Sequence, residues 1–177
     1  MASVVFLRAI NVGKANRCQP AQIAKQLGKF DVINIGAVGT FVVRKPASQA
    51  ALRAAIAQQL PFKCDMMIVP GRDLLELAAR EPFRGQPRGP DITHFVNVLA
   101  KPLPKPVPVP HFLPSPKEWL VKVVAVEKRF VLGLYRRQMK AIGYLGKLEK
   151  QLGVPATNRN WNTIEKVIRV LEAGSFV

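Results

Sequence analysis

Residues 32–43 read Val-Ile-Asn-Ile-Gly-Ala-Val-Gly-Thr-Phe-Val-Val. The runs 32–35 and 41–43 are short, apolar and rich in β-branched residues, and such runs are typical of strands. Between them lies a segment that contains Gly39, which can adopt the positive φ angle of a tight turn. The stretch therefore predicts a β-hairpin.

A strand and a helix are predicted on each side of this hairpin. Before it, residues 4–10 form an apolar strand, and a helix begins at about Pro20. After it, Ser48 is a good N-cap for a helix that runs to about Leu60, and residues 66–69 form a fourth strand. The order strand, helix, strand, strand, helix, strand is that of a ferredoxin-like half, in which helices cover one face of a four-stranded antiparallel sheet.

The rest of the chain predicts a second half. Residues 82–91 hold three prolines and two glycines and are the predicted linker. A strand at 93–100 and a hairpin over 119–135 follow it. The predicted fold class is therefore α+β: two linked ferredoxin-like halves with antiparallel sheets, residues 1–81 and 92–177, with extra helices at the C-terminus.

Those extra helices show an apolar stripe at helical spacing. Asn162 is the predicted N-cap of the second, which should start near Thr163, and Glu165 completes a capping box. The residues expected to face inward are Ile142, Leu145, Leu148 and Leu152 in the first helix, and Ile164, Val167, Ile168 and Leu171 in the second.

Composition indicates a folded, basic protein. Hydrophobic residues make up 49% of the chain, which is enough for a core, and the net charge is +16. Such a charge attracts nucleic acids, acidic proteins and phosphorylated metabolites without choosing among them. No apolar run approaches the roughly 18 residues of a membrane helix. We therefore expect a cytoplasmic protein without membrane contact, and the oligomeric state is left open.

Known catalytic motifs and metal-ligand spacings are absent from the sequence, so no cofactor or metal is expected and enzymatic activity is left open. His94 and His111 have no paired cysteine or carboxylate nearby in sequence, and a structural role is the simpler interpretation. Cys18 precedes a helix start, which lowers the pKa of a thiol. The alternatives are a reactive thiol and a small loop residue, and we expect Cys64 in the core.

Two polar segments are candidate anion sites. The first follows the strand at 4–10 and offers Arg8, Asn11, Gly13 and Lys14, because backbone amides of a glycine loop with flanking cations suit an anion. The second, residues 152–163, is predicted to be a polar loop that leads into a helix N-terminus. It offers Arg159, Asn160 and Trp161. The alternative is structural: Arg8 faces solvent and Arg159 pairs with a surface acid.

Trp161 separates these two interpretations. A core residue should be largely buried, whereas a stacking platform should expose its ring beside Arg159. We predict a core residue that packs back on the following helix.

The densest basic stretch is the candidate nucleic-acid surface, and its alternative is a solvated charged face. Its residues are Lys128, Arg129, Arg136, Arg137 and Lys140. Residues 101–110 carry proline at every second position and predict an extended connector, with an exposed interaction arm as the alternative.

Both polar segments also carry a family resemblance. The first contains Leu7-Arg8-Ala9-Ile10-Asn11-Val12-Gly13, and the second contains Gly-Val-Pro-Ala-Thr-Asn-Arg-Asn-Trp-Asn-Thr at 153–163. In these motifs the chain resembles the bacterial family called domain of unknown function 1697. Its members open with Leu-Arg-Gly-Ile-Asn-Val-Gly and close with the second motif, with threonine in place of Asn158. The resemblance implies two linked α+β, ferredoxin-like halves and brings no activity.

The chain departs from the pattern of that family at several polar positions. Ala9 stands where glycine is usual, Val38-Gly39-Thr40 replaces Ser-Gly-Asn, and Ala141-Ile142-Gly143 replaces Ser-Lys-Leu. If those residues form a site in the family, this chain has lost part of it, which leaves a member with altered or no activity open.

Overall fold

The computed structural model describes residues 1–174. In this part the chain is α+β, with two antiparallel sheets and five α-helices. It divides into two compact units, and each is described by itself. The first unit comprises Met1–Glu76 and the residues from Asn162 onward, and the second comprises Leu77–Trp161.

The first unit contains a four-stranded sheet. Its strands are β1 (Ser3–Leu7), β2 (Val32–Ile35), β3 (Thr40–Val43) and β4 (Met66–Pro70), in the order β2-β3-β1-β4 with every pair antiparallel. The four predicted strands and the hairpin are confirmed. Successive residues of β1 point to opposite faces, yet Val4 and Val5 are both fully buried because both faces are covered.

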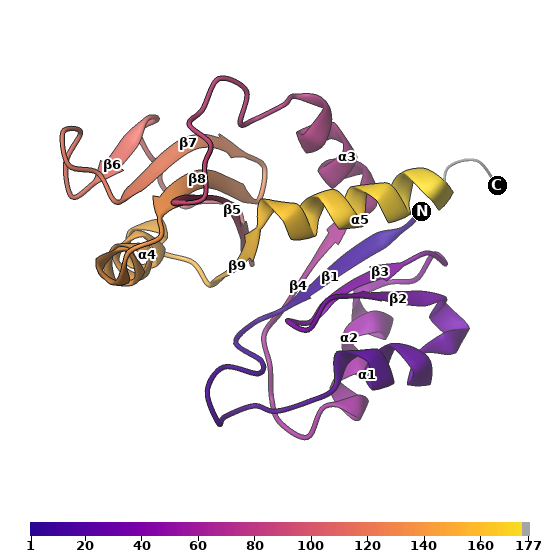
Figure 1. The fold of residues 1–177 in the computed structure, drawn as a ribbon. Helices are drawn as coiled ribbons and strands as arrows, with labels where there is room; N and C mark the ends of the chain where they lie inside the picture. The colour runs from indigo at the N-terminus through magenta and orange to yellow at the C-terminus, as the bar shows by residue number, and fades with distance from the viewer. Residues whose placement is uncertain (175–177) are drawn as a thin grey trace. The chain divides into compact units, whose positions relative to one another are not determined.

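Two helices cover one face of this sheet, as Figure 1 shows. They are α1 (Pro20–Gln26), which continues into the short 3-10 helix η1 (Gly28–Phe30), and α2 (Gln49–Gln59). Their apolar residues share a core with the odd-numbered residues of β1. The predicted N-cap of α2 is confirmed, since the Ser48 hydroxyl accepts a hydrogen bond of 3.1 Å from the amide of Ala51.

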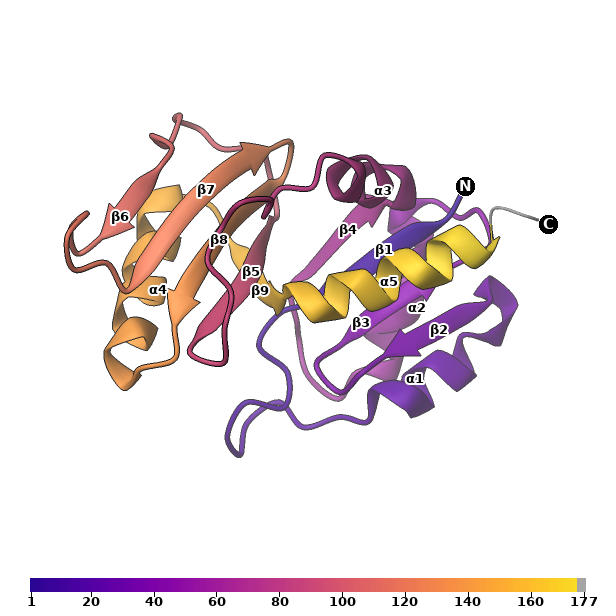
Figure 2. The same cartoon turned by 45° about the horizontal axis from the view of Figure 1, so that its top comes forward.

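Helix α5 (Trp161–Gly174) crosses the opposite face of the same sheet (Figures 1 and 2). It buries Ile164, Val167 and Leu171 as predicted, but Ile168 is only half-buried. The predicted N-cap at Asn162 is wrong. The helix begins at Trp161, so Asn162 already lies in its first turn.

The second unit contains a five-stranded sheet in the order β6-β7-β8-β5-β9, again antiparallel throughout. The prediction of β5 and of the β7–β8 hairpin is confirmed, whereas β6 and β9 were not predicted. The strands are β5 (Ile92–Leu99), β6 (His111–Leu113), β7 (Val121–Glu127), β8 (Phe130–Arg136) and β9 (Ala156–Asn160).

Helix α4 (Met139–Leu152) shares a core with this sheet, and Leu148 and Leu152 are buried as predicted. The prediction that Ile142 faces inward is wrong. Ile142 is 66% exposed, and the neighbouring Ala141 is buried instead. Leucines at 145, 148 and 152 fix the orientation of the helix, and Ala141 continues their stripe by a step of four residues.

The segment 82–91 folds onto β5. The Phe83 ring is buried and stacks on His94 with 4.5 Å between ring centroids, and His94 Nε2 lies 2.8 Å from the Pro87 carbonyl oxygen. The bounds of the compact units also differ from those of the predicted halves. The units place the segment 82–91 inside the second unit and α5, from Asn162 on, with the first.

The proline-rich segment is anchored in the second unit. Residues 101–110 have no regular secondary structure, and Leu103 and Val107 pack against the core beneath α4. An extended connector that lies on a core is expected to make such apolar contacts at intervals, as Leu103 and Val107 do. This arrangement supports the connector over the exposed arm.

Candidate functional site

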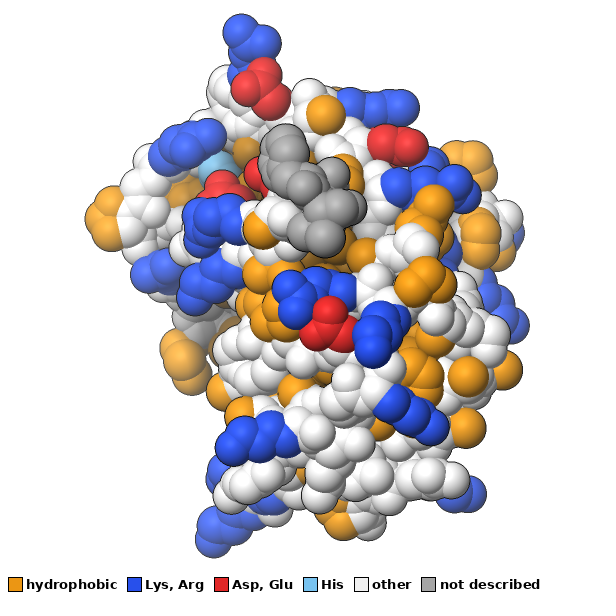
Figure 3. Space-filling view, turned by 90° about the vertical axis from the view of Figure 1, so that its right-hand side faces the viewer, with side chains coloured by type: hydrophobic (Ala, Val, Ile, Leu, Met, Phe, Trp, Pro, Cys, Tyr) orange, Lys and Arg blue, Asp and Glu red, His pale blue; other side chains and the backbone are white. Residues whose placement is uncertain are grey.

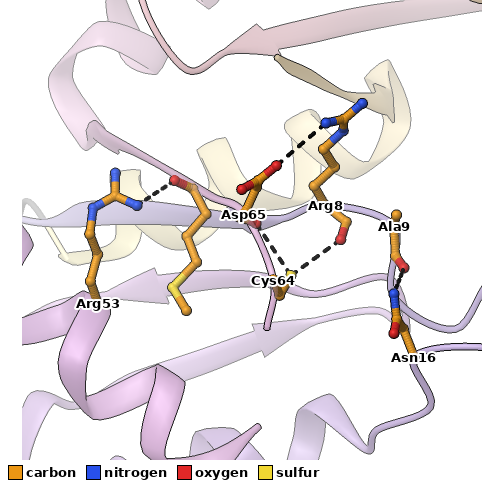
Figure 4. A network of polar contacts seen from close by, with 7 residues as sticks. Arg8, Ala9, Asn16, Arg53, Cys64 and Asp65 are labelled. Carbon is orange, nitrogen blue, oxygen red and sulfur yellow. Dashed lines mark hydrogen bonds and ion pairs between the residues drawn. The ribbon is translucent and has the colours of Figure 1, made fainter. Parts of the chain in front are cut away.

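The opening polar segment is a loop between β1 and α1 in the first unit. Arg8 leaves the end of β1, and its Nη1 lies 3.4 Å from Asp65 Oδ2 (Figure 4). The Arg8 amide also donates to the Asp65 carbonyl at 2.9 Å. The side chains of Arg8 and Asp65 are 37% and 63% exposed, so this is a surface ion pair.

Asn11 acts as a brace within this loop. Its Nδ2 donates to the Ala37 carbonyl at 3.1 Å, and its Oδ1 accepts from the Cys18 amide at 2.9 Å. One side chain thereby joins the β1–α1 loop, the β2–β3 turn and the start of α1. Both polar ends of Asn11 are occupied by backbone, which gives the residue a structural task that the sequence did not indicate.

Gly13 and Lys14 lie in an exposed turn, in which the Ala15 amide lies 3.4 Å from the Val12 carbonyl oxygen. Gly13 has a φ of +59°, in the left-handed region that glycine adopts without steric cost. A hollow of about 540 Å³ lies at the base of this loop. It is lined by Asn11, Arg17, Cys18, Gln19 and Ala37. The exposed Arg17 was missed because no motif marks it.

Cys18 lines the same hollow. Burial raises the pKa of its thiol above the ordinary value. A raised pKa lowers the thiolate fraction at neutral pH, so this direction opposes the reactive thiol and favours the small loop residue. Cys64 is half-buried and packs against the first core, with its sulfur 3.2 Å from the Arg8 carbonyl oxygen (Figure 4).

Two backbone positions, one in the opening loop and one in the β2–β3 turn, favour glycine. Ala9, which stands where the family has glycine, has a φ of +55°. Gly39 has a φ of +83°, and a Cβ there would lie 2.8 Å from Leu7 Cβ. The β2–β3 turn therefore keeps its glycine, whereas the loop tolerates alanine at position 9 in a conformation that costs an L-residue roughly 1–2 kcal/mol.

The closing segment is not the predicted loop. Residues 156–160 form β9, an antiparallel partner of β5 in the second unit. The strand alternates in burial, with Thr157 and Arg159 buried and Asn158 and Asn160 exposed. Asn158 Nδ2 donates to the buried Asn97 Oδ1 at 3.0 Å, which ties the two strands together through their side chains.

Arg159 is 5% exposed and does not sit on the surface as the structural alternative supposed. Its Nη1 donates to Thr157 Oγ1 at 2.8 Å and to the Asn158 carbonyl at 2.9 Å. A buried guanidinium needs hydrogen-bond partners, and its own strand supplies two of them. The opening segment belongs to the first unit and Arg159 to the second, so their convergence on one ligand stays a prediction.

Trp161 lies between the two predicted extremes. It is half-buried, and its ring meets the Phe83 ring edge-on with centroids 5.1 Å apart. The prediction of a largely buried core residue therefore holds only in part, and within the second unit the contact is with Phe83.

The basic cluster separates into two groups. Lys128 and Arg129 occupy the β7–β8 turn, whereas Arg136, Arg137 and Lys140 lie at the other end of β8 and the start of α4. Six strand steps of about 3.4 Å put roughly 20 Å between these ends. Arg129 Nε donates to the Leu99 carbonyl at 2.8 Å. Residues that lie within 13 positions of one another in sequence thus form two separate basic groups.

No cluster of three or more potential metal ligands occurs among residues 1–174. Over the same range, no helix is long and apolar enough to cross a membrane. His94 stacks on Phe83, and His111 Nε2 lies 2.8 Å from Gln151 Oε1, so both imidazoles have structural contacts.

A family model matches most of the chain. The family model described as "Protein of unknown function (DUF1697)" matches residues 1–118. The chain belongs to this family. The match includes the opening motif and ends before the closing one. No curated protein matches the chain.

A solved structure has a similar fold. The fold is similar to that of conserved bacterial protein SP0830 from Streptococcus pneumoniae, with a TM-score of 0.54 and 14% identity. The similarity covers 96% of this chain and 98% of the other. At this identity it shows the fold alone.

Proposed function

We propose that this protein binds a nucleic acid through a basic surface at the end of β8 in the second unit. We call this surface the platform, and it consists of Trp119, Arg136, Arg137 and Lys140. The observation that carries the proposal is that Arg136 stacks on the Trp119 ring and is followed along the chain by Arg137 and Lys140, all three without an acidic partner among the described residues. Within residues 1–174, none of the three forms an ion pair, whereas Arg8, Arg44, Arg80 and Arg84 each do.

The geometry of the platform suits stacking and phosphate contact. The Arg136 guanidinium lies over the Trp119 ring at 3.9 Å, and its Nε donates to the Trp119 carbonyl at 2.9 Å. Arg137 is fixed by its Nε, which donates to Thr93 Oγ1 at 3.0 Å. In both side chains the guanidinium group is oriented by a hydrogen bond from Nε. Lys140 follows in the first turn of α4 and is exposed.

The chemistry favours a nucleic acid over other anions. Aromatic and arginine planes stack on bases, and cations neutralise the backbone phosphates. A net charge of +16 adds long-range attraction that any polyanion would feel. Phosphate contacts alone give binding without sequence preference, and we expect binding of this kind here.

The two ends of β8 provide a matched experiment. The variant Arg137→Gln/Lys140→Gln removes two charges from the platform, and Lys128→Gln/Arg129→Gln removes two from the opposite end. Binding of a labelled single-stranded oligonucleotide is measured by fluorescence anisotropy across a salt series. We expect the platform variant to bind at least about tenfold more weakly and to lower the salt slope by about 2, since each lost phosphate contact removes about 1.

The control variant should bind only slightly more weakly than the unmodified protein, because its net charge is lower. Equal losses in the two variants would show that binding is diffuse. The absence of binding by the unmodified protein at low salt would end the proposal altogether.

A small-molecule anion site at the β1–α1 loop is a second candidate function. The hollow beside Arg17 supports it. Arg8, Gly13 and Lys14 belong to the same loop but do not line the hollow. Convergence of this loop with Arg159, Asn160 and Trp161 belongs to this candidate as a proposal. Titration with inorganic phosphate should shift the amide NMR signals of residues 13–19, and Arg17→Gln should abolish those shifts while Lys25→Gln preserves them.

Two finer statements also belong here. We infer that the first unit is ferredoxin-like, because its βαββαβ element order and its strand order agree with that description. The second unit follows the order ββββαβ and supports the description less well. A cytoplasmic location remains our expectation from the sequence.

A further inference from the structure

A second cavity lies in the first unit and shares no lining residue with the hollow at the β1–α1 loop. Its volume is about 590 Å³, which is within the range of small-molecule pockets. It opens beside the start of β1, the start of helix α3 (Gly71–Ala79) and the last turns of α5. Its apolar lining residues are Met1, Ala2, Val42, Leu75, Val170 and Leu171.

A glycine permits this junction. A Cβ on Gly71 would lie 2.8 Å from Leu171 Cδ2 and 3.2 Å from the Ala2 carbonyl oxygen. The Gly71 amide donates to that same carbonyl at 2.9 Å. The start of β1, the start of α3 and the last turns of α5 can therefore approach closely around the cavity.

The rim of the cavity carries charge. Arg44 forms a bidentate ion pair with Asp31 and donates two hydrogen bonds of 2.8 Å. The hydrogen bond from Arg44 holds the pKa of the Asp31 carboxyl below its ordinary value, so this pair stays ionised and mutually neutralised at neutral pH. Arg72 differs, because its Nε reaches Asp73 only at 4.0 Å and its side chain is 63% exposed. One cation of the rim is therefore weakly compensated.

Figure 3 looks onto this end of the first unit and shows hydrophobic side chains recessed next to basic and acidic ones. We propose that the cavity binds an amphipathic monoanion, a carboxylate with a short apolar tail. The tail would occupy the space between Val42, Leu75 and Val170, and the carboxylate would meet Arg72. The proposal is independent of the nucleic-acid platform, which lies in the other unit.

Charge complementarity distinguishes this occupant from the alternatives. A neutral apolar molecule would fill the same lining but leave Arg72 with only its long contact to Asp73. A purely polar anion would meet Arg72 but leave the apolar lining in contact with water. Only a molecule with both parts satisfies the rim and the lining together.

Octanoate is the probe, and binding is followed by amide NMR shifts of the full chain and by calorimetry. We expect saturable binding with shifts centred on Gly71, Leu75 and Val170. Butanoate lacks four methylene groups and should bind more than about tenfold more weakly, because each buried methylene contributes about 0.8 kcal/mol. The uncharged 1-octanol should also bind more weakly than octanoate.

Two variants test the two halves of the site. Arg72→Gln should weaken octanoate binding about fivefold, the effect expected of one exposed ion pair, and leave 1-octanol unchanged. Leu75→Trp should fill the cavity and abolish binding of both. Arg84→Gln is the control, since Arg84 is an exposed arginine outside the lining. Arg72 is on the surface, so its variant remains decisive if Leu75→Trp does not fold.

Three results would overturn the proposal. The first is equal affinity for octanoate and 1-octanol, and the second is shifts that lie away from the cavity or do not saturate. The third is the absence of octanoate binding by the full chain at millimolar concentration.

Discussion

The opening and closing segments are alike in sequence and opposite in structure. Both are short polar runs that contain one arginine and at least one asparagine, and both resemble the motifs of the family. The opening segment is a loop whose arginine forms an exposed ion pair. The closing segment is an edge strand whose arginine is buried and bonded to its own strand. The same residue type thus lies at the surface in one unit and in the interior in the other.

The difference shows that the main role of these polar side chains is to form hydrogen bonds with the backbone. The Asn11 side chain donates to the Ala37 carbonyl and accepts from the Cys18 amide, and Arg159 donates to the Asn158 carbonyl. Buried polar groups require such partners, so a motif of this composition arises from folding alone. A motif of Arg and Asn is therefore weak evidence of a ligand site until its hydrogen bonds are assigned.

Arg159→Ala should have the largest effect on stability. It removes at least two hydrogen bonds and the packing of a buried aliphatic stem, so we expect a loss of about 3 kcal/mol in the free energy of unfolding. The exposed Arg8→Ala should cost less than about 1 kcal/mol, as surface ion pairs do. Urea denaturation of both variants measures the contrast, and equal losses would contradict the assignment of interior and surface roles.

Trp161→Ala should cost about 2 kcal/mol, less than the 3–5 kcal/mol of a fully buried aromatic, because the ring is half-buried and meets Phe83 by its edge. Trp161→Phe keeps an edge-on aromatic contact and is the control, with a loss below about 1 kcal/mol. Thermal and urea unfolding measure both variants. A negligible loss for Trp161→Ala would return Trp161 to the list of ligand candidates.

Asn11→Ala should cost about 1.5–2 kcal/mol, since two hydrogen bonds of about 1 kcal/mol each are lost and alanine fits the φ of +54° poorly. Asn11→Gly removes the same hydrogen bonds but accepts the backbone angle. The difference between the two variants in urea denaturation isolates the backbone strain. If Asn11→Ala is as stable as the unmodified protein, the side chain is not a brace.

Much of the fold was predictable from the sequence because local patterns and tertiary packing agree. The hairpin at 32–43 and the cap at Ser48 are local features, and the structure contains both. The closing segment was mispredicted because Thr157 to Asn160 has turn composition but lies in register with β5. Pairing with a strand about 60 residues away in the chain overrides local propensity, and no local signal reveals it.

The candidate site was predictable only as a list of residues. The five basic residues from Lys128 to Lys140 are close in sequence, but β8 separates them into two groups. Trp119 joins one group through its contact with Arg136, and a sequence spacing of 17 residues gives no hint of that contact. Hydrogen-bond partners and ion pairs decide which cations are available, and they appear only with tertiary structure.

Ala9→Gly should produce the smallest change and the only gain. Ala9 is exposed and holds a φ of +55°, so glycine relieves the steric cost of the left-handed conformation without removing a buried contact. Glycine also loses more backbone entropy on folding, which offsets part of that gain. We expect a net increase of about 0.5–1 kcal/mol in the free energy of unfolding.

The control for this gain is Ala15→Gly. Ala15 is an exposed alanine of the same loop that is not among the positive-φ residues. It should lose about 0.5 kcal/mol, because glycine there adds only unfolded-state entropy. Urea denaturation with parallel m-values measures both variants. Destabilisation by Ala9→Gly would mean that the alanine methyl makes a favourable contact, and the departure from the family glycine would then be an adaptation of this loop rather than a tolerated strain.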